Sequence, residues 1–158
     1  MARIIAVTNQ KGGVGKTTTC VNLSACMAAQ GKRVLVVEID PQGNCTSGFG
    51  LKAPEGRSTY EALLEPENAA DCIMDTCVEG LRLMPSGMQL AGAEIELIGM
   101  DGRESRLKRA LEPLGDVFDY IMIDSPPSLG ILTLNGHTAA HSVIVPIQCE
   151  YYALEGVG

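Results

Sequence analysis

One stretch of the chain decides the fold, and it reads Asn9-Gln10-Lys11-Gly12-Gly13-Val14-Gly15-Lys16-Thr17-Thr18-Thr19. It follows the apolar run Ile4–Val7, which predicts a short buried strand, and it precedes residues 20–30, which predict a helix. A glycine-rich loop between a strand and a helix is the setting in which such a loop binds phosphate. We therefore interpret the stretch as a phosphate-binding loop rather than as a simple tight turn.

The residue types in this loop suit phosphate chemistry. Glycines lack a Cβ, so the backbone can curve and bring its N–H groups close to an anion. A helix beginning near Lys16 would point its unpaired N–H groups at the same spot, and the lysine would reach the outer phosphates. The hydroxyl of Thr17 is an oxygen ligand suited to Mg²⁺. The predicted nucleotide-binding residues are Lys11, Gly12, Gly13, Val14, Gly15, Lys16, Thr17 and Thr18.

The loop departs from the common pattern G-x-x-x-x-G-K-[ST] at its first position. The pattern's first glycine would fall at residue 10, where the chain has Gln10. A second lysine, Lys11, stands at the head of the loop instead.

The next predicted strand, residues 33–39, is almost continuously apolar and ends at Asp40. Such a run is typical of a strand covered on both faces, as in a parallel sheet. Ligands of open α/β sheets bind beyond the carboxyl ends of the strands, so Asp40 should lie beside the loop. An aspartate before Pro41 could also serve only to start a turn.

A further buried strand, Tyr120–Asp124, ends in an aspartate followed by Pro126 and Pro127. A strand that ends in Asp downstream of a phosphate loop is the Walker B arrangement, in which the carboxylate helps to hold Mg²⁺. The candidate metal ligands are therefore Thr17, Asp40 and Asp124.

The rest of the chain completes an α/β pattern. Ser58–Glu61 fits a capping box, residues 45–58 read as loop, and further helices and strands are predicted over 81–85, 90–98, 105–114, 131–140 and 142–146. The predicted fold class is α/β: a P-loop NTPase-like three-layer sandwich with a mainly parallel sheet of three to five strands, forming a single domain over residues 1–158.

Composition narrows the function. The net charge of −7 argues against strong nucleic-acid binding by this chain alone. The six cysteines have no C-x-x-C spacing, no apolar run approaches membrane-spanning length, and no signal-peptide layout is present, which together indicate the cytoplasm. His137 and His141 have an i, i+4 spacing that can bind zinc, but a third ligand is not evident, so we do not interpret them as a metal site.

The run K-G-G-V-G-K-T resembles the deviant Walker A loop of the ParA, MinD and nitrogenase iron protein class of ATPases. The runs Asp40–Asn44, Asp124–Leu129 and Val145–Gly156 look like ParA/Soj chromosome- and plasmid-partitioning ATPases, and the resemblance covers the chain from Arg3 onward. MinD-type cell-division ATPases usually lack the D-P-Q-G-N run, and the iron protein's cluster cysteines are not found here.

This resemblance implies an ATPase, slow unless stimulated, that uses ATP/ADP and Mg²⁺. It implies an ATP-dependent homodimer, a ParB-like activator and non-specific DNA binding on the nucleoid by the full-length protein, without a membrane partner. It also implies that Lys11 acts across the dimer, Lys16 holds phosphate and Asp40 orients the attacking water, which makes these three the catalytic candidates.

Members of that family continue well beyond Gly158, so the chain is expected to be an N-terminal portion that lacks the DNA-binding surface and much of the adenine pocket. Two alternatives remain open at this point. The chain could be a non-catalytic P-loop module that acts in protein interaction, or a MinD-like cell-division ATPase.

Overall fold

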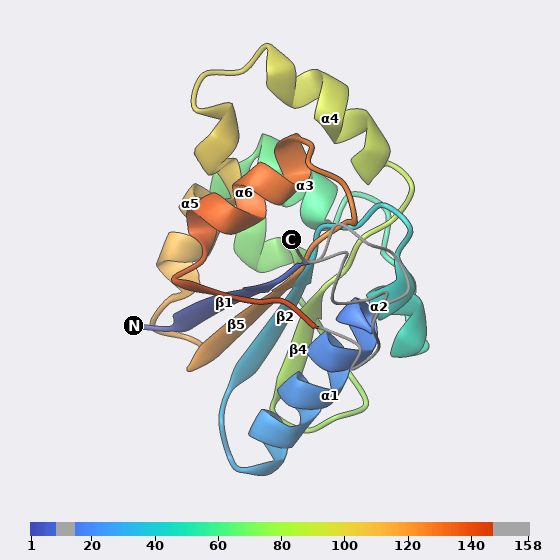
Figure 1. Cartoon of the computed structure of the whole chain (residues 1–158), viewed down its shortest axis with the longest axis vertical. Helices are drawn as coiled ribbons and strands as arrows, with labels where there is room; N and C mark the ends of the chain where they lie inside the picture. The colour runs from blue at the N-terminus through green and yellow to red at the C-terminus, as the bar shows by residue number, and fades with distance from the viewer. Residues whose placement is uncertain (9–14, 147–158) are drawn as a thin grey trace, which may run out of the picture.

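The computed structural model describes residues 1–8 and 15–146, in which helices cover both faces of a central sheet (Figure 1). The predicted loop residues Lys11, Gly12, Gly13 and Val14 lie outside the described residues, as does the end of the chain from residue 147.

The sheet is mainly parallel, as predicted. Among the described residues it has six strands in the order β3-β4-β2-β5-β1-β6, and only β3 runs antiparallel to its neighbour. The strands are β1 (Arg3–Val7), β2 (Val34–Glu38), β3 (Met74–Asp75), β4 (Leu81–Met84), β5 (Tyr120–Asp124) and β6 (Ser142–Ile144). The prediction of three to five strands was therefore too low, because the two-residue edge strand β3 carries no apolar run that would reveal it.

The register brings the site to one edge of the sheet. Val7 of β1 and Glu38 of β2 are both paired with Asp124 of the intervening strand β5. These three central strands therefore end at the same level of the sheet.

The helices are α1 (Lys16–Ala29), α2 (Asn44–Gly48), α3 (Thr59–Leu64), α4 (Leu90–Ile98), α5 (Arg106–Leu111) and α6 (Ile131–Ala139). Short 3₁₀ helices cover η1 (Pro66–Cys72), η2 (Arg103–Ser105) and η3 (Glu112–Leu114). The predicted capping box is present at the start of α3, where the Glu61 carboxylate accepts the Ser58 backbone N–H and the Ser58 hydroxyl accepts the Tyr60 N–H. The expectation of loop over residues 45–58 was wrong at its start, because α2 occupies Asn44–Gly48.

Alternate residues of the central strands point to opposite faces of the sheet. Val34 and Val36 of β2 pack with α1, whereas Leu35 and Val37 belong to the core beneath α3, α5 and α6. All four side chains are fully buried, and each such burial stabilises the fold by about 1.5–3 kcal/mol. The three-layer sandwich is thus confirmed.

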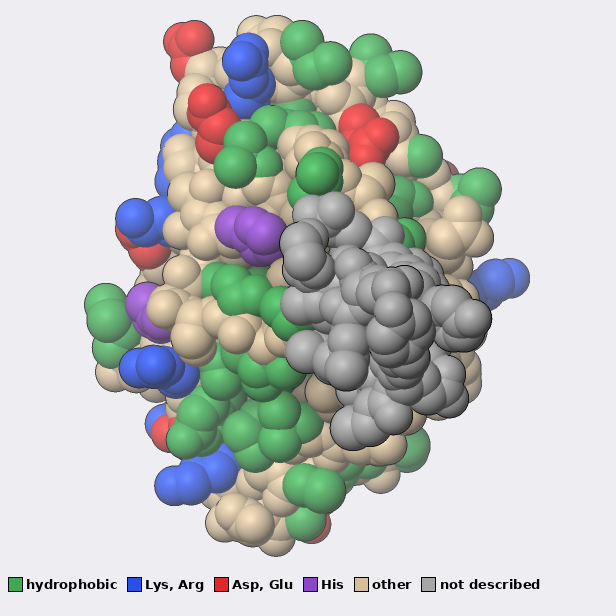
Figure 2. Space-filling model, viewed as in Figure 1, with side chains coloured by type: hydrophobic (Ala, Val, Ile, Leu, Met, Phe, Trp, Pro, Cys, Tyr) green, Lys and Arg blue, Asp and Glu red, His purple; other side chains and the backbone are tan. Residues whose placement is uncertain are grey.

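Several large apolar side chains reach the surface as well (Figure 2). Around α4 and α6 they include Ile95, Ile98 and Leu129, at 76%, 63% and 73% exposure. In the part of the chain that the structure describes, no helix has both the length and the apolar character needed to cross a membrane.

Candidate nucleotide and magnesium site

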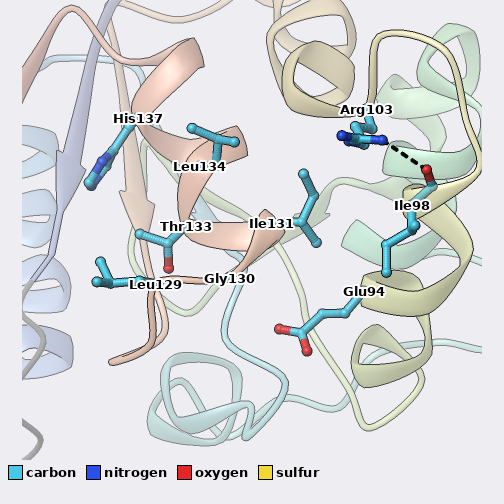
Figure 3. A pocket seen from close by; sticks show the side chains of 9 residues that line it. All are labelled: Glu94, Ile98, Arg103, Leu129, Gly130, Ile131, Thr133, Leu134 and His137. Carbon is cyan, nitrogen blue, oxygen red and sulfur yellow. Dashed lines mark hydrogen bonds between the residues drawn. The ribbon is translucent and has the colours of Figure 1, made fainter.

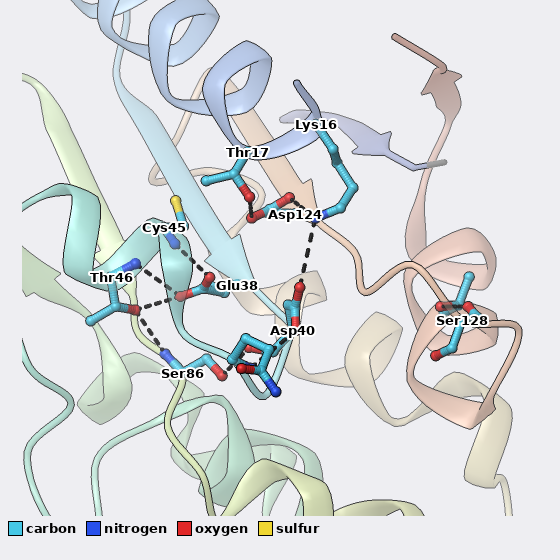
Figure 4. A network of polar contacts seen from close by, with 11 residues as sticks. Lys16, Thr17, Glu38, Asp40, Cys45, Thr46, Ser86, Asp124 and Ser128 are labelled. Carbon is cyan, nitrogen blue, oxygen red and sulfur yellow. Dashed lines mark hydrogen bonds and ion pairs between the residues drawn. The ribbon is translucent and has the colours of Figure 1, made fainter. Parts of the chain in front are cut away.

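The start of α1 meets the end of β5 through side-chain contacts (Figure 4). The Lys16 ammonium group donates to Asp124 Oδ1 at 2.8 Å, and the Thr17 hydroxyl donates to Asp124 Oδ2 at 3.0 Å. Gly15 leads into the helix with φ 78°, a left-handed conformation that glycine adopts without strain. The predicted phosphate lysine and magnesium hydroxyl therefore both contact the predicted Walker B carboxylate.

Asp124 is fully buried, and burial is the main reason that its pKa is raised. The Lys16 ammonium and the hydrogen bonds from Lys16 and Thr17 act in the opposite direction without cancelling that rise. Because burial leaves the ionised form of this carboxyl group poorly solvated, an additional nearby cation would stabilise that form.

The donor set fits Mg²⁺ bound together with phosphate. Mg²⁺ prefers oxygen ligands and commonly takes one or two protein ligands, the rest being water and substrate phosphate. Thr17, Asp124 and Asp40 offer such oxygens close together. Within residues 1–8 and 15–146, no group of three or more His, Cys, Asp or Glu side chains is arranged to hold a metal by itself. This arrangement suits a nucleotide-linked magnesium ion better than a free-standing metal site.

Asp40 follows β2 and reaches the same cluster. Its Oδ2 atom lies 3.8 Å from the Lys16 ammonium, and the residue is only 4% exposed. Its Oδ1 atom accepts the backbone N–H of Gln42 at 3.0 Å, and its carbonyl accepts the N–H of Gly43 at 3.1 Å. Asp40 therefore both shapes the turn after β2 and presents a carboxylate oxygen to Lys16.

A third buried carboxyl group, Glu38, was not predicted as part of the site. Its carboxylate accepts the backbone N–H groups of Cys45 and Thr46 at 2.7 and 2.9 Å and the Thr46 hydroxyl at 2.6 Å. Burial raises the pKa of Glu38 to about 7, although these three hydrogen bonds favour the ionised form. The Glu38 carboxylate thus caps the start of α2, which explains how a short helix forms where loop was expected.

Two hydroxyl groups extend this arrangement. Ser86, just after β4, donates its backbone N–H to the Thr46 hydroxyl and its own hydroxyl to the carbonyl of Asp40. The signal available in the sequence was Glu38 itself, an ionisable residue inside an otherwise apolar strand. Thr46 and Ser86 are 40 positions apart and carry no comparable local signal.

The two histidines do not share a helix face. α6 ends at Ala139, so His137 lies within the helix and His141 lies beyond it. The Nδ1 atom of His141 accepts the backbone N–H of Ile4 at 3.0 Å, which gives this side chain a structural contact. Thr18, one of the predicted loop residues, is exposed on α1.

A cavity of about 590 Å³ lies apart from this cluster (Figure 3). It opens between α4 and α6, and it is lined by Glu94, Ile98, Arg103, Leu129, Gly130, Ile131, Thr133, Leu134 and His137. None of the described nucleotide-site residues lines it, so this cavity is separate from the candidate nucleotide site.

A parallel sheet whose first strand leads to a lysine–threonine helix start, beside a strand ending in Asp, defines the P-loop NTPase class. The chain belongs to the AAA domain family AAA_31, whose model matches residues 2–158. The resemblance to ParA/Soj partitioning proteins is confirmed.

Two relatives carry names from sporulation and from chromosome partitioning. The chain is 60% identical to the sporulation initiation inhibitor protein Soj of Bacillus subtilis, over 99% of the chain and 62% of that protein. It is 52% identical to the chromosome partitioning protein ParA of Myxococcus xanthus, over 99% of the chain and 56% of that protein. The chain thus spans somewhat more than half the length of these relatives.

A solved structure carries a different name. The chain resembles a cobyrinic acid a,c-diamide synthase from Mycobacterium smegmatis, solved with a bound ATP analogue and magnesium. The TM-score is 0.90 at 51% identity, over 100% of this chain and 65% of the solved chain. Bound nucleotide and magnesium in that protein agree with the donor set described above.

Proposed function

We propose that residues 1–158 are the N-terminal portion of a single ATPase domain that binds Mg²⁺-ATP and hydrolyses it to ADP and phosphate in chromosome or plasmid partitioning. The observation that carries the proposal is the contact of Lys16 and Thr17 with Asp124, with Asp40 beside them. The name of the Myxococcus xanthus relative, a chromosome partitioning protein, supports the partitioning role.

Each residue has a distinct task in this proposal. Lys16 and the N–H groups at the start of α1 hold the phosphates. Thr17 and Asp124 hold Mg²⁺, which when bound neutralises charge on the phosphate oxygens. Asp40 lies at the same sheet edge with one carboxylate oxygen not used by its own turn, and it orients the attacking water.

The proposed role of Lys11 and the proposed partner molecules are based on the resemblance to the ParA/Soj family. Lys11 reaches across an ATP-dependent homodimer to the partner's nucleotide, and a ParB-like protein stimulates hydrolysis. The longer protein binds DNA without sequence preference on the nucleoid in the cytoplasm. These partners would belong to the whole protein rather than to this chain alone.

The test of the proposal is Asp40→Ala, with ATP affinity and turnover measured separately. An interaction made mainly in the transition state lowers turnover when lost but leaves binding unchanged. We expect ATP affinity within about threefold of wild type, equivalent to roughly 0.6 kcal/mol. We expect hydrolysis to fall by at least ~100-fold.

The exposed Asp101 offers a matched control, since Asp101→Ala removes a carboxylate far from the cluster in sequence and should change neither quantity. If Asp40→Ala abolishes ATP binding, Asp40 is a metal ligand or a structural residue. If turnover is unchanged, Asp40 does not orient the water.

A further inference from the structure

A ring of buried hydrogen bonds surrounds the turn that carries Asp40 (Figure 4). Glu38 Oε1 accepts the Thr46 hydroxyl at 2.6 Å, and the Thr46 hydroxyl oxygen accepts the Ser86 N–H at 3.1 Å. The Ser86 hydroxyl then donates to the Asp40 carbonyl at 2.7 Å. Because Glu38 and Asp40 are two residues apart, the backbone closes the ring.

Each hydroxyl in the ring has a fixed direction. The Thr46 hydroxyl accepts the Ser86 backbone N–H and donates its hydrogen to the Glu38 carboxylate, so the orientation of this hydroxyl is fixed. Thr46 and Ser86 are only 3% and 4% exposed, so water cannot readily replace a lost partner. The ring therefore ties the end of β2, the start of α2 and the end of β4 into one unit.

The turn is also tightly packed against β4. Gly43 has φ 68°, and a Cβ built there would lie 3.3 Å from the Ser86 carbonyl oxygen. Ser86 therefore lies against both ends of the turn. Its hydroxyl contacts the Asp40 carbonyl, and its backbone carbonyl lies close to Gly43.

We propose that Thr46 and Ser86 are positioning residues that hold the Asp40 carboxylate beside Lys16, with Glu38 as their anchor. This inference rests on the proposed function, in which Asp40 orients the attacking water. Neither hydroxyl touches the Lys16–Thr17–Asp124 contacts, so they act through Asp40. A displacement of about 1 Å in a catalytic group can cost ~100-fold in rate, so loss of such support should lower turnover while sparing binding.

Side-chain variants of the full 158-residue chain test this. Ser86→Ala and Thr46→Val should each lower kcat about tenfold and leave the KM for ATP within about threefold. Thr46→Ser keeps the hydroxyl and should restore near wild-type kcat. A merely structural role would not separate kcat from KM.

Two matched controls lose equivalent hydrogen bonds elsewhere. Ser24 is a buried serine that donates to the backbone carbonyl of Cys20 at 2.6 Å, so Ser24→Ala is the counterpart of Ser86→Ala. Thr76 donates to the Leu81 carbonyl at 2.7 Å, near the amino end of β4, so Thr76→Val is the counterpart of Thr46→Val. Both controls should keep wild-type kcat.

Amide hydrogen exchange over residues 38–47 gives a readout that needs no turnover. Loss of one such hydrogen bond should raise local exchange about fivefold in Ser86→Ala and Thr46→Val. The same segment should exchange at the wild-type rate in Ser24→Ala and Thr76→Val.

The outcomes separate the two proposals. Faster local exchange together with lower kcat supports the positioning role, whereas unchanged exchange in Ser86→Ala and Thr46→Val overturns it. Unchanged kcat in these variants of an active wild type also overturns it. If the wild type shows no turnover, the proposed ATPase activity of this chain fails, and the exchange pattern alone then decides whether Thr46 and Ser86 hold the turn.

Discussion

At the scale of single residues, Glu38 is an ionisable group in the most buried strand of the sheet. Burial raises the pKa of Glu38 from 4.5 to about 7, so the folded protein binds this proton more tightly than the unfolded chain does. Stability from this group is therefore fully present below pH 4.5 and is lost as the pH rises toward 7. The corresponding change in unfolding free energy is at most about 3 kcal/mol.

Glu38→Gln should flatten this pH dependence, because an amide does not titrate in that range. We expect urea denaturation at pH 5 and pH 7 to give a smaller difference in unfolding free energy for Glu38→Gln than for wild type. Glu112→Gln, at an exposed position, is the control and should behave as wild type. An identical pH dependence in Glu38→Gln and wild type would show that Glu38 is not the group responsible.

At the scale of elements, the start of α3 depends on its cap. The Ser58 hydroxyl accepts the Tyr60 N–H and donates to Glu61, and the Glu61 carboxylate accepts the Ser58 N–H. We expect Ser58→Ala to lower the unfolding free energy by about 0.5–2 kcal/mol in urea denaturation.

Ser105 offers a contrast for that measurement. It precedes α5, but its hydroxyl donates to the Gly102 carbonyl and does not cap the helix. Ser105→Ala should therefore cost less than about 0.5 kcal/mol. An equal cost in both variants would mean that helix capping is not what Ser58 contributes.

The elements also show which features a sequence can reveal. β2 and β5 were predictable because a strand buried on both faces is a continuous apolar run, and the aspartates at their ends marked the site edge. α2 was missed because its start depends on the Glu38 carboxylate, a tertiary contact. The i, i+4 spacing of His137 and His141 was not interpreted as a metal site, and α6 ends between the two residues. The Thr46–Ser86 contact joins distant positions by a hydrogen bond, and periodicity carries no information about such pairs.

At the scale of the whole molecule, charge dominates the expected behaviour toward nucleic acid. The chain carries a net charge of −7, which disfavours the release of counterions from DNA that drives non-specific binding. We expect a Kd for random duplex DNA weaker than about 10⁻⁴ M at physiological salt. A mobility shift at low micromolar protein that disappears on raising the salt would contradict this expectation.

The central claim is that the helix start at Lys16 holds the phosphates of ATP, and calorimetric titration of the chain with Mg²⁺-ATP tests it most directly. Lys16→Ala removes a charge-assisted contact of the kind worth ~1.5–3 kcal/mol, so affinity should fall roughly ten- to a hundredfold. Lys108→Ala removes an exposed lysine on α5 and should leave affinity unchanged. Equal affinity of Lys16→Ala and wild type would contradict the account.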